Sequence, residues 1–439
     1  MSDVPRASLP SRSAGLAALS RGTAERRMFR IAAAATLLLP PVLLYTRAAA
    51  DTLLSLVAIL FLISRWALRD TDWLRPLHVR LALIFWAWEL FCTLIAGRPH
   101  EIGEVLVVMR LFVFAAALEF WVLADSRQRR RLQYVITAVA LWIVIETWQQ
   151  YVLGTNIFGY PRWGSGVLTG PLPGPRAGLS LQTIYFAAFL PLAMALIARP
   201  QWRYRLSGGA VLIVSMLTMA LIGQRMPMLL VLFGYGIAAL VMPSFRWPMI
   251  VAVLALAAAV AIAGVAAPEE YHTLVTVFLH RMENFWSEPY AIIYQRAIVM
   301  VQAHPWLGLG YDGYRDNCYD PRYIRILAWI PVTAIHDPAG CTIHPHNYWL
   351  QIATDSGLTG VALFAALCIA WLVRIGRFMQ APGRAIQVGL FVSLCIAFWP
   401  IASTTGLFTL PNAGWLFLLI GWGLAERQAS RAVPDRPQQ

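Results

Sequence analysis

The segment Pro248–Ala267 reads PMIVAVLALAAAVAIAGVAA and contains no formally charged residue. Its length matches the ~20 residues that a helix needs to cross the hydrocarbon core of a bilayer. The rest of the chain is similar: of 439 residues, 59% are hydrophobic and only 13% are charged, against about 25% in soluble domains. Inside a bilayer every backbone polar group needs a partner within the protein, which favours helices. We therefore predict an all-α polytopic membrane protein.

The chain contains further apolar segments of this kind, and we predict twelve transmembrane helices in all. Their boundaries are expected near 31–46, 49–64, 81–97, 105–124, 132–153, 179–198, 206–222, 227–243, 248–267, 358–373, 385–402 and 411–425. This predicts an N-terminal tail (1–30), helices one to nine (31–267), a large loop (268–357), helices ten to twelve (358–425) and a C-terminal tail (426–439). The polar ends, 1–25 and 428–439, are expected to be disordered.

The basic residues predict the orientation of these helices. All 35 are arginines, and the predicted spans place 24 of them on one face of the membrane and 10 on the other. By the positive-inside rule the first face is cytoplasmic; both termini then lie inside, and the loop 268–357 lies on the periplasmic side. Because the arginines alternate with apolar runs, we interpret the net charge of +13 as a topology signal and expect no nucleic-acid partner. Arg110 lies within a span, where we expect it to pair with Glu104 or Glu119.

The predicted large loop is about ninety residues long, and a loop of this length is usually functional or structured. We expect helices near 268–286 and 290–303, followed by the turn-rich segment LGLGYDGYRDNCYDP. Cys318 and Cys341 both lie in this loop. A periplasmic location permits a disulfide between them, and the alternative is a pair of free thiols.

The end of the loop holds a polar cluster in the segment Cys341–Gly360, CTIHPHNYWLQIATDSGLTG. Proline suits the first turn of a helix, so a helix that starts at Pro345 would place His346 at its positive end. This position disfavours the charged imidazolium, and a neutral imidazole can act as a general base. Asn347 would cap the helix or contact a substrate hydroxyl. The alternative is that His344 and His346 are ordinary surface residues of a polar loop.

A zinc site is a competing interpretation of the same cluster. The side chains of His336, Asp337, His344 and His346 are of the types that ligate zinc. However, His344 and His346 are two residues apart around a proline, unlike the usual helical pair at i and i+4. We therefore expect no metal at this cluster.

Two arginines stand out by their position. Arg225 lies in LIGQRMPM between two apolar runs, and an arginine at membrane depth usually faces a functional cavity. Arg296 lies in YAIIYQRAIVMVQAHPWLGLG, on a predicted amphipathic helix near the membrane. The planar guanidinium suits phosphate, so both residues, and also Arg176 in GPLPGPRAGLS, are candidates to bind a phosphorylated lipid. The alternative is that Arg225 reaches lipid headgroups and Arg296 pairs with Glu283 or Glu288.

Taken together, these motifs resemble the O-antigen ligase and polymerase superfamily. The resemblance rests on LIGQRMPMLLVL, YQRAIVMVQAHPWLGLGYDGY and HPHNYWLQIATDSGLTG, in this order, and covers residues 205–375 by motif and the whole chain by number of spans. Two departures are visible: Asp355 stands where glutamate is commoner, and LIGQRMP replaces the usual Ser-Arg-Gly.

The resemblance implies a glycosyltransferase of the GT-C kind in the bacterial inner membrane, active at the periplasmic face without metal, cofactor or nucleotide sugar. Its donor would be a glycan on undecaprenyl pyrophosphate, and its acceptor a sugar hydroxyl of the lipid A–core. His346 would be the general base, and Arg225 and Arg296 would stabilise the departing pyrophosphate. Further substrate contacts would come from His344, Asn347, Tyr311, Asp312 and Arg176.

Within the superfamily we favour the ligase, because twelve spans with the large loop between the ninth and tenth fit it best. The alternatives are an O-antigen polymerase and a protein O-oligosaccharyltransferase, which usually carries a larger C-terminal periplasmic domain. Outside the superfamily, the alternative is a lipid or solute transporter. A transporter is expected to show paired broken helices in two related halves, and the sequence shows no such symmetry.

Overall fold

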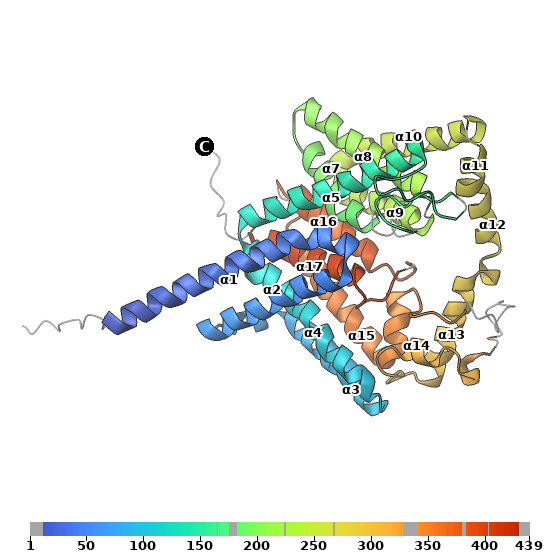
Figure 1. Cartoon of the computed structure of the whole chain (residues 1–439). Coiled ribbons are helices and arrows are strands. Elements are labelled where there is room, and N and C mark those ends of the chain that lie inside the picture. The colour runs from blue at the N-terminus through green and yellow to red at the C-terminus, as the bar shows by residue number, and fades with distance from the viewer. Residues whose placement is uncertain are drawn as a thin grey trace, which may run out of the picture.

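The computed structural model describes residues 12–164, 166–174, 182–223, 225–266, 268–325, 327, 340–379, 383–402 and 404–429. Its described part is built from helices, and each of the twelve predicted spans overlaps one of them (Figure 1). These are α1 (Arg12–Tyr45), α2 (Arg47–Leu68), α3 (Leu77–Ile95), α4 (Pro99–Phe120), α5 (Ser126–Leu153), α7 (Leu190–Ile197, after a π-helical turn at Tyr185–Phe189), α8 (Trp202–Ile222), α9 (Arg225–Val241), α10 (Arg246–Ala266), α15 (Tyr348–Gly376), α16 (Ala385–Ala397) and α17 (Asn412–Ala429).

Eight helical segments in the described residues are long and apolar enough to cross a membrane, and three shorter apolar helices lie at 182–197, 226–241 and 385–397. The helix α10 contains the segment that opened the sequence analysis, and its side chains are largely uncovered by protein; Leu254, Ile262 and Val265 are exposed. Apolar side chains on a helix surface of this kind are stable only against lipid. The prediction of an all-α polytopic membrane protein is therefore confirmed.

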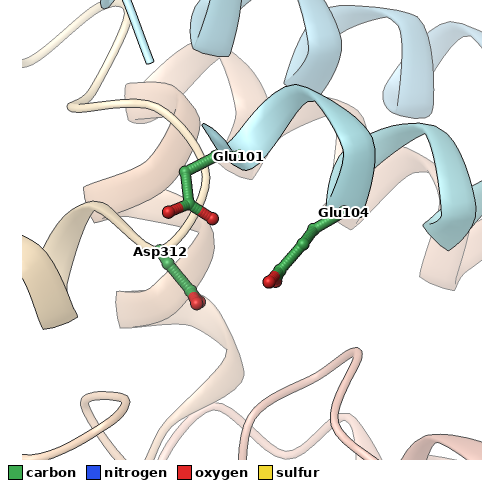
Figure 2. A group of neighbouring side chains, drawn as sticks. All are labelled: Glu101, Glu104 and Asp312. Carbon is green, nitrogen blue, oxygen red and sulfur yellow. The ribbon is translucent and has the colours of Figure 1, made fainter. Parts of the chain in front are cut away.

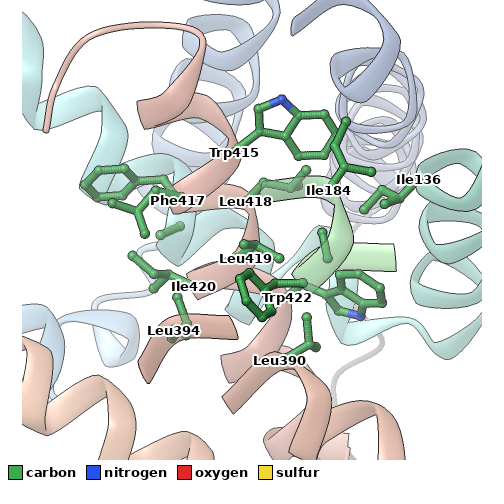
Figure 3. Close-up of a cluster of buried hydrophobic side chains, with 14 of the residues drawn as sticks. Ile136, Ile184, Leu390, Leu394, Trp415, Phe417, Leu418, Leu419, Ile420 and Trp422 are labelled. Atoms are coloured by element: carbon green, nitrogen blue, oxygen red, sulfur yellow. The ribbon is translucent and has the colours of Figure 1, made fainter. Parts of the chain in front are cut away.

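The centre of the molecule is the pair α4 and α17, which pack along each other and against α2, α3 and α16. Small residues let the two backbones approach: a Cβ on Gly421 would lie 2.7 Å from Cβ of Leu118. Around this contact, α17 contributes large apolar side chains to the core; Figure 3 shows Trp415, Phe417 and Trp422 among the leucines and isoleucines of neighbouring helices.

The described residues between α10 and α15 include the helices α11 (Pro268–Tyr271), α12 (Val277–Glu283, after a π-helical turn at His272–Thr276), α13 (Pro289–Ala303) and α14 (Gly313–Asn317). In Figure 1, α11 and α12 run along the edge of the molecule from α10 to α13, and α13 lies beside α15. We call the end of the bundle where this segment meets residues 398–411 the loop side.

The expected disorder at the N-terminus is wrong in part, and one predicted boundary falls inside a helix. The first span begins within a helix that starts at Arg12, so residues 12–25 are helical rather than disordered. The tenth span was predicted to begin at 358; the helix that contains it, α15, starts at Tyr348 and has a break at Gly357, where φ is 70° and ψ is −172°. The predicted division between loop and span at residue 357 therefore falls inside a helix.

Candidate active site

The polar cluster of the sequence lies at the start of α15, on the loop side. Asn347 is the residue that caps this helix: its Oδ1 accepts a hydrogen bond from the backbone N–H of Leu350 at 3.0 Å. Its Nδ2 donates to the carbonyl oxygens of Pro400 at 2.7 Å and Ala402 at 3.1 Å. Asn347 therefore joins the helix to the segment before α17.

The sequence predicted His346 in the first turn of the helix. In the structure it lies just outside the helix, before the cap residue Asn347. Its backbone is in the left-handed region with φ of 50°, which a helix beginning at Pro345 would not allow. Two hydrogen bonds with Thr404 hold this conformation. The backbone N–H of Thr404 donates to the carbonyl of His346 at 2.7 Å, and Nδ1 of His346 donates to the carbonyl of Thr404 at 3.1 Å.

The bond to Thr404 decides the tautomer of His346. A carbonyl oxygen only accepts, so Nδ1 carries the hydrogen and Nε2 of the neutral ring keeps its lone pair. Burial lowers the pKa of His346 below its ordinary value, although the bond to the Thr404 carbonyl opposes this shift. The half-buried ring is therefore a neutral base whose acceptor nitrogen has no partner among the described residues.

His344 packs against His346, with ring centroids 4.5 Å apart, and is only 7% exposed. Burial lowers its pKa to about 4, with a further contribution from the charge of His346. Its Nε2 makes no hydrogen bond within the described chain. His336 and Asp337, the other residues of the alternative zinc site, lie outside the described residues.

The helix α13 brings Arg296 close to the same segment. Arg296 is 4% exposed; its guanidinium donates to the carbonyl of Cys318 at 3.0 Å and lies directly under Gly340, where a Cβ would approach its Cζ to 2.8 Å. The Tyr314 hydroxyl donates to the carbonyl of Gly340 at 2.5 Å, and Cys318 and Cys341 form a disulfide in the structure. Arg296 thus lies beneath the chain that leads to the two histidines.

The first half of α15 ends at the break at Gly357. Residues 305–313 pack against this break and satisfy its backbone groups. The backbone N–H groups of Leu309 and Gly310 donate to the carbonyls of Thr354 at 2.8 Å and Asp355 at 2.9 Å. In return, the N–H of Leu358 donates to the carbonyl of Pro305 at 2.7 Å. The motifs HPWLGLGYDGY and DSGLTG are therefore two halves of one backbone contact.

Tyr311 and Asp312, two predicted substrate contacts, belong to this second region. Tyr311 is buried, and its ring stacks on Phe408 with centroids 6.2 Å apart. Burial, and then the charge of Glu104, raises the pKa of Asp312 to about 6. Neither residue has a described contact with His346.

Asp312 also belongs to a group of three carboxylates that the sequence analysis did not identify. Its oxygens and those of Glu101 and Glu104, from the first turns of α4, lie within 4.8 Å of one another (Figure 2). Such a group offers oxygen ligands of the kind that a divalent cation prefers. Arg315 already pairs with Asp312 at 3.4 Å, which partly neutralises the group.

The remaining arginines differ in how far the structure describes them. Arg225 is the first residue of α9, so it lies at a helix end as expected, but its side chain is outside the description. Arg176 lies outside the described residues altogether.

Two residues near the base had no signal in the sequence. Thr404 contacts His346 through backbone atoms, and such contacts do not depend on residue type. Tyr290, in the first turn of α13, places its ring 5.4 Å from that of His346. The segment YAIIYQR, which contains Tyr290, drew attention only through Arg296.

Comparison with known proteins agrees with these motifs. The family model described as O-antigen ligase matches residues 209–365, which include Arg225, Arg296 and His346. No curated protein matches the chain. The family match, the order of the motifs and the helical architecture together support membership of the chain in the O-antigen ligase superfamily.

Proposed function

We propose that the chain is an O-antigen ligase, a glycosyltransferase that moves a glycan from undecaprenyl pyrophosphate to a sugar hydroxyl of the lipid A–core at the periplasmic face of the inner membrane. The observation that carries the proposal is the geometry of His346. Its Nδ1–H is bound to the Thr404 carbonyl, and no described residue bonds to its Nε2. His346 also lies within residues 209–365, which the family model matches.

In the proposed reaction, Nε2 of His346 takes the proton of the acceptor hydroxyl as the acceptor oxygen attacks the anomeric carbon of the donor. The bond from that carbon to the phosphate oxygen breaks, and the pyrophosphate leaves with the bonding electrons. The imidazolium that forms is stabilised by the Nδ1 hydrogen bond to Thr404, as a carboxylate stabilises it in other enzymes. The proton then passes to solvent or to the pyrophosphate.

In this proposal, Arg225 and Arg296 stabilise the negative charge that develops on the leaving pyrophosphate. Fixed cationic donors at the place where charge develops supply the largest part of many rate enhancements. Arg296 is buried beneath Gly340 and bound to the Cys318 carbonyl. A phosphate oxygen would therefore replace part of these contacts when the donor binds, and the disulfide would limit how far the segment moves.

The test is reconstitution. Purified protein in lipid nanodiscs is mixed with undecaprenyl-pyrophosphate-linked glycan and lipid A–core, once with EDTA and once with Mg²⁺, and the joined product is measured by mass spectrometry. We expect product in both conditions. Product only with Mg²⁺ would show that a metal ion, and not the arginines alone, stabilises the charge of the leaving group. Its candidate ligands would be Glu101, Glu104 and Asp312.

The same assay separates the alternatives. Longer lipid-linked chains formed from donor alone would identify a polymerase, and a glycosylated protein acceptor would identify a protein O-oligosaccharyltransferase. Absence of product in every condition, together with donor movement across vesicle membranes, would contradict the enzyme proposal and favour a transporter.

A further inference from the structure

We propose that Tyr290 is a sugar-binding residue whose exposed ring holds the acceptor sugar against the free nitrogen of His346. The inference rests on the proposed function, because it takes His346 as the base that deprotonates the acceptor. It adds a binding site for the reacting sugar that neither the sequence motifs nor the family match assigns.

The position of Tyr290 follows from the start of α13. Pro289 occupies the first position of this helix, where its missing N–H costs nothing, and Tyr290 follows in the first turn. From there its ring meets the ring of His346 at 5.4 Å with an interplanar angle of 70°. The rings of His346 and Tyr290 therefore lie next to each other on the loop side, at a steep angle.

The other sides of His346 are already occupied. Thr404 takes Nδ1, and the ring of His344 lies 4.5 Å away. Of the polar atoms of this half-buried imidazole, Nε2 is the one that no described residue bonds. A hydroxyl that reaches this nitrogen therefore brings its sugar ring to the neighbourhood of Tyr290.

Tyr290 remains available for this contact. Its side chain is 41% exposed, whereas Tyr294, one helical turn later and 6.5 Å away, is half-buried and supports it from below. The Tyr290 hydroxyl has no hydrogen-bond partner within the described chain, although tyrosine hydroxyls near an interior usually find one. An aromatic face and a free hydroxyl thus lie side by side next to the base.

This combination suits a sugar. A pyranose ring has an apolar face of C–H groups and a rim of hydroxyls. The negatively polarised face of an aromatic ring attracts the C–H groups, and the tyrosine hydroxyl can bond the rim. An anionic phosphate could accept a hydrogen bond from the hydroxyl, but the negatively polarised ring face does not attract it. The two features together therefore fit the acceptor sugar better than the pyrophosphate.

The experiment compares Tyr290→Leu, which keeps an apolar side chain without a ring, with Tyr290→Phe, which keeps the ring. Initial rates are measured against lipid A–core and against lipid-linked glycan. We expect Tyr290→Leu to raise the acceptor KM about tenfold, the equivalent of ~1.4 kcal/mol, with a smaller fall in kcat and little change in the donor KM. Tyr290→Phe should stay within about threefold of the wild-type acceptor KM, which corresponds to less than ~1 kcal/mol.

Tyr319→Leu is the matched control, because Tyr319 is 71% exposed and belongs to the same loop. An unchanged acceptor KM in Tyr290→Leu, an equal rise in the control, or a rise in the donor KM instead would overturn the assignment. If Tyr290→Leu does not fold, Tyr290→Trp replaces it: the larger ring is expected to lower the acceptor KM, and a rise equal to that of a non-aromatic Tyr290→Met would contradict stacking.

A binding measurement separates this inference from the proposed function. Core oligosaccharide released from rough lipopolysaccharide is titrated into the His346→Ala protein, with and without Tyr290→Leu, and followed by saturation-transfer NMR. Binding that is lost with Tyr290→Leu supports the sugar site even if the chain transfers no glycan. Binding that is equal in both proteins contradicts it even if the chain is a ligase.

Discussion

The two ends of the first half of α15 are built in different ways. At the break, Gly357 lies so close to the loop 305–313 that a Cβ would approach the carbonyl carbon of Trp306 to 2.4 Å, and backbone hydrogen bonds run in both directions. At the start, Asn347 and Thr404 hold the helix and His346 with a few bonds, and the ring of His346 keeps one nitrogen free.

This difference separates the motifs of the sequence into those that the fold requires and those that carry the proposed chemistry. The glycine-rich pieces, GLGYDG and DSG, are required by close backbone contact, since only glycine has no side chain to place there. In the piece HPHN, His346 is half-buried, and the buried His344 has an Nε2 without a partner among the described residues. Unpaired polar groups of this kind cost stability and are typical of sites that carry chemistry. We expect changes at the break to affect folding and changes at the start to affect catalysis.

The largest expected effect is that of His346→Ala. Loss of a general base typically costs roughly 10²- to 10⁴-fold in rate, so glycan transfer should fall by this amount while expression and thermal stability stay near wild type. The rate of product formation and the melting temperature are measured on the same preparation. Full activity in this variant would show that His346 is not the base. It would also contradict the assignment of catalysis to the start of α15 and of folding to the break.

The pH dependence sharpens this prediction. The base must be neutral, and burial lowers the pKa of His346 below its ordinary value near 6.5. The value of kcat/KM should therefore be already constant at pH 7 and fall only as the pH drops below 6.5. A limb that lies above pH 7 would show that another group controls the reaction.

Gly357→Ala tests the other region. The new Cβ would collide with the Trp306 carbonyl at a residue with φ of 70°, and strain at such positions costs about 1–3 kcal/mol before the clash is counted. We expect poor yield or a clear fall in melting temperature, measured by scanning fluorimetry in detergent. Gly236→Ala in α9 is the control, because a Cβ there meets no atom within 4 Å. Normal stability with lost activity would contradict a scaffolding role for the break.

His344 gives a smaller effect, on stability against pH. Its pKa is about 4 in the folded chain and near 6.5 when unfolded, so below pH 6.5 the unfolded state binds more protons. Stability should therefore fall as the pH drops from 6.5 to 4, by up to ~3 kcal/mol at ~1.4 kcal/mol for each pH unit. Melting temperatures of the wild type and His344→Gln are compared across this range. An equal slope in both proteins would show that the burial of His344 does not contribute.

The sequence was most informative where lipid leaves few choices. Twelve apolar segments had to be helices, and the described helices overlap them. The tenth span, predicted from 358, covers only the part of α15 after Gly357. The first half of this helix depends on residues 305–313 to satisfy the broken turn, a contact across some forty positions that no local pattern shows. The predicted partner of Arg110 was wrong for a similar reason, because its partner is distant in the sequence. Arg110 pairs with Asp51 of α2 and not with Glu104 or Glu119.

Within the candidate site, residue type decided what could be predicted. His346 and Arg296 were visible because few residues carry their chemistry, and the structure places both on the loop side. Thr404 acts through its backbone and had no signal in the sequence. Asn347 was predicted either to cap the helix or to contact substrate, and its described bonds are those of a cap.

The smallest expected effect follows from this cap. Asn347→Ser keeps an oxygen that can cap α15 but loses the two bonds from Nδ2 to the carbonyls of Pro400 and Ala402. Two such bonds are worth about 1–2 kcal/mol in stability, so the melting temperature should fall only slightly. Thr404 lies in the segment that these bonds hold, so looser positioning of His346 should lower kcat more than it changes either KM. Ser64→Ala is the control for a loss of stability without loss of kcat, because it removes two part-buried bonds far from the site: the one that Ser64 donates to Glu25 and the one that it accepts from Arg65. If Asn347→Ser instead raises the acceptor KM and leaves kcat unchanged, Asn347 contacts the substrate, and the start of α15 binds the sugar directly as well as positioning the base.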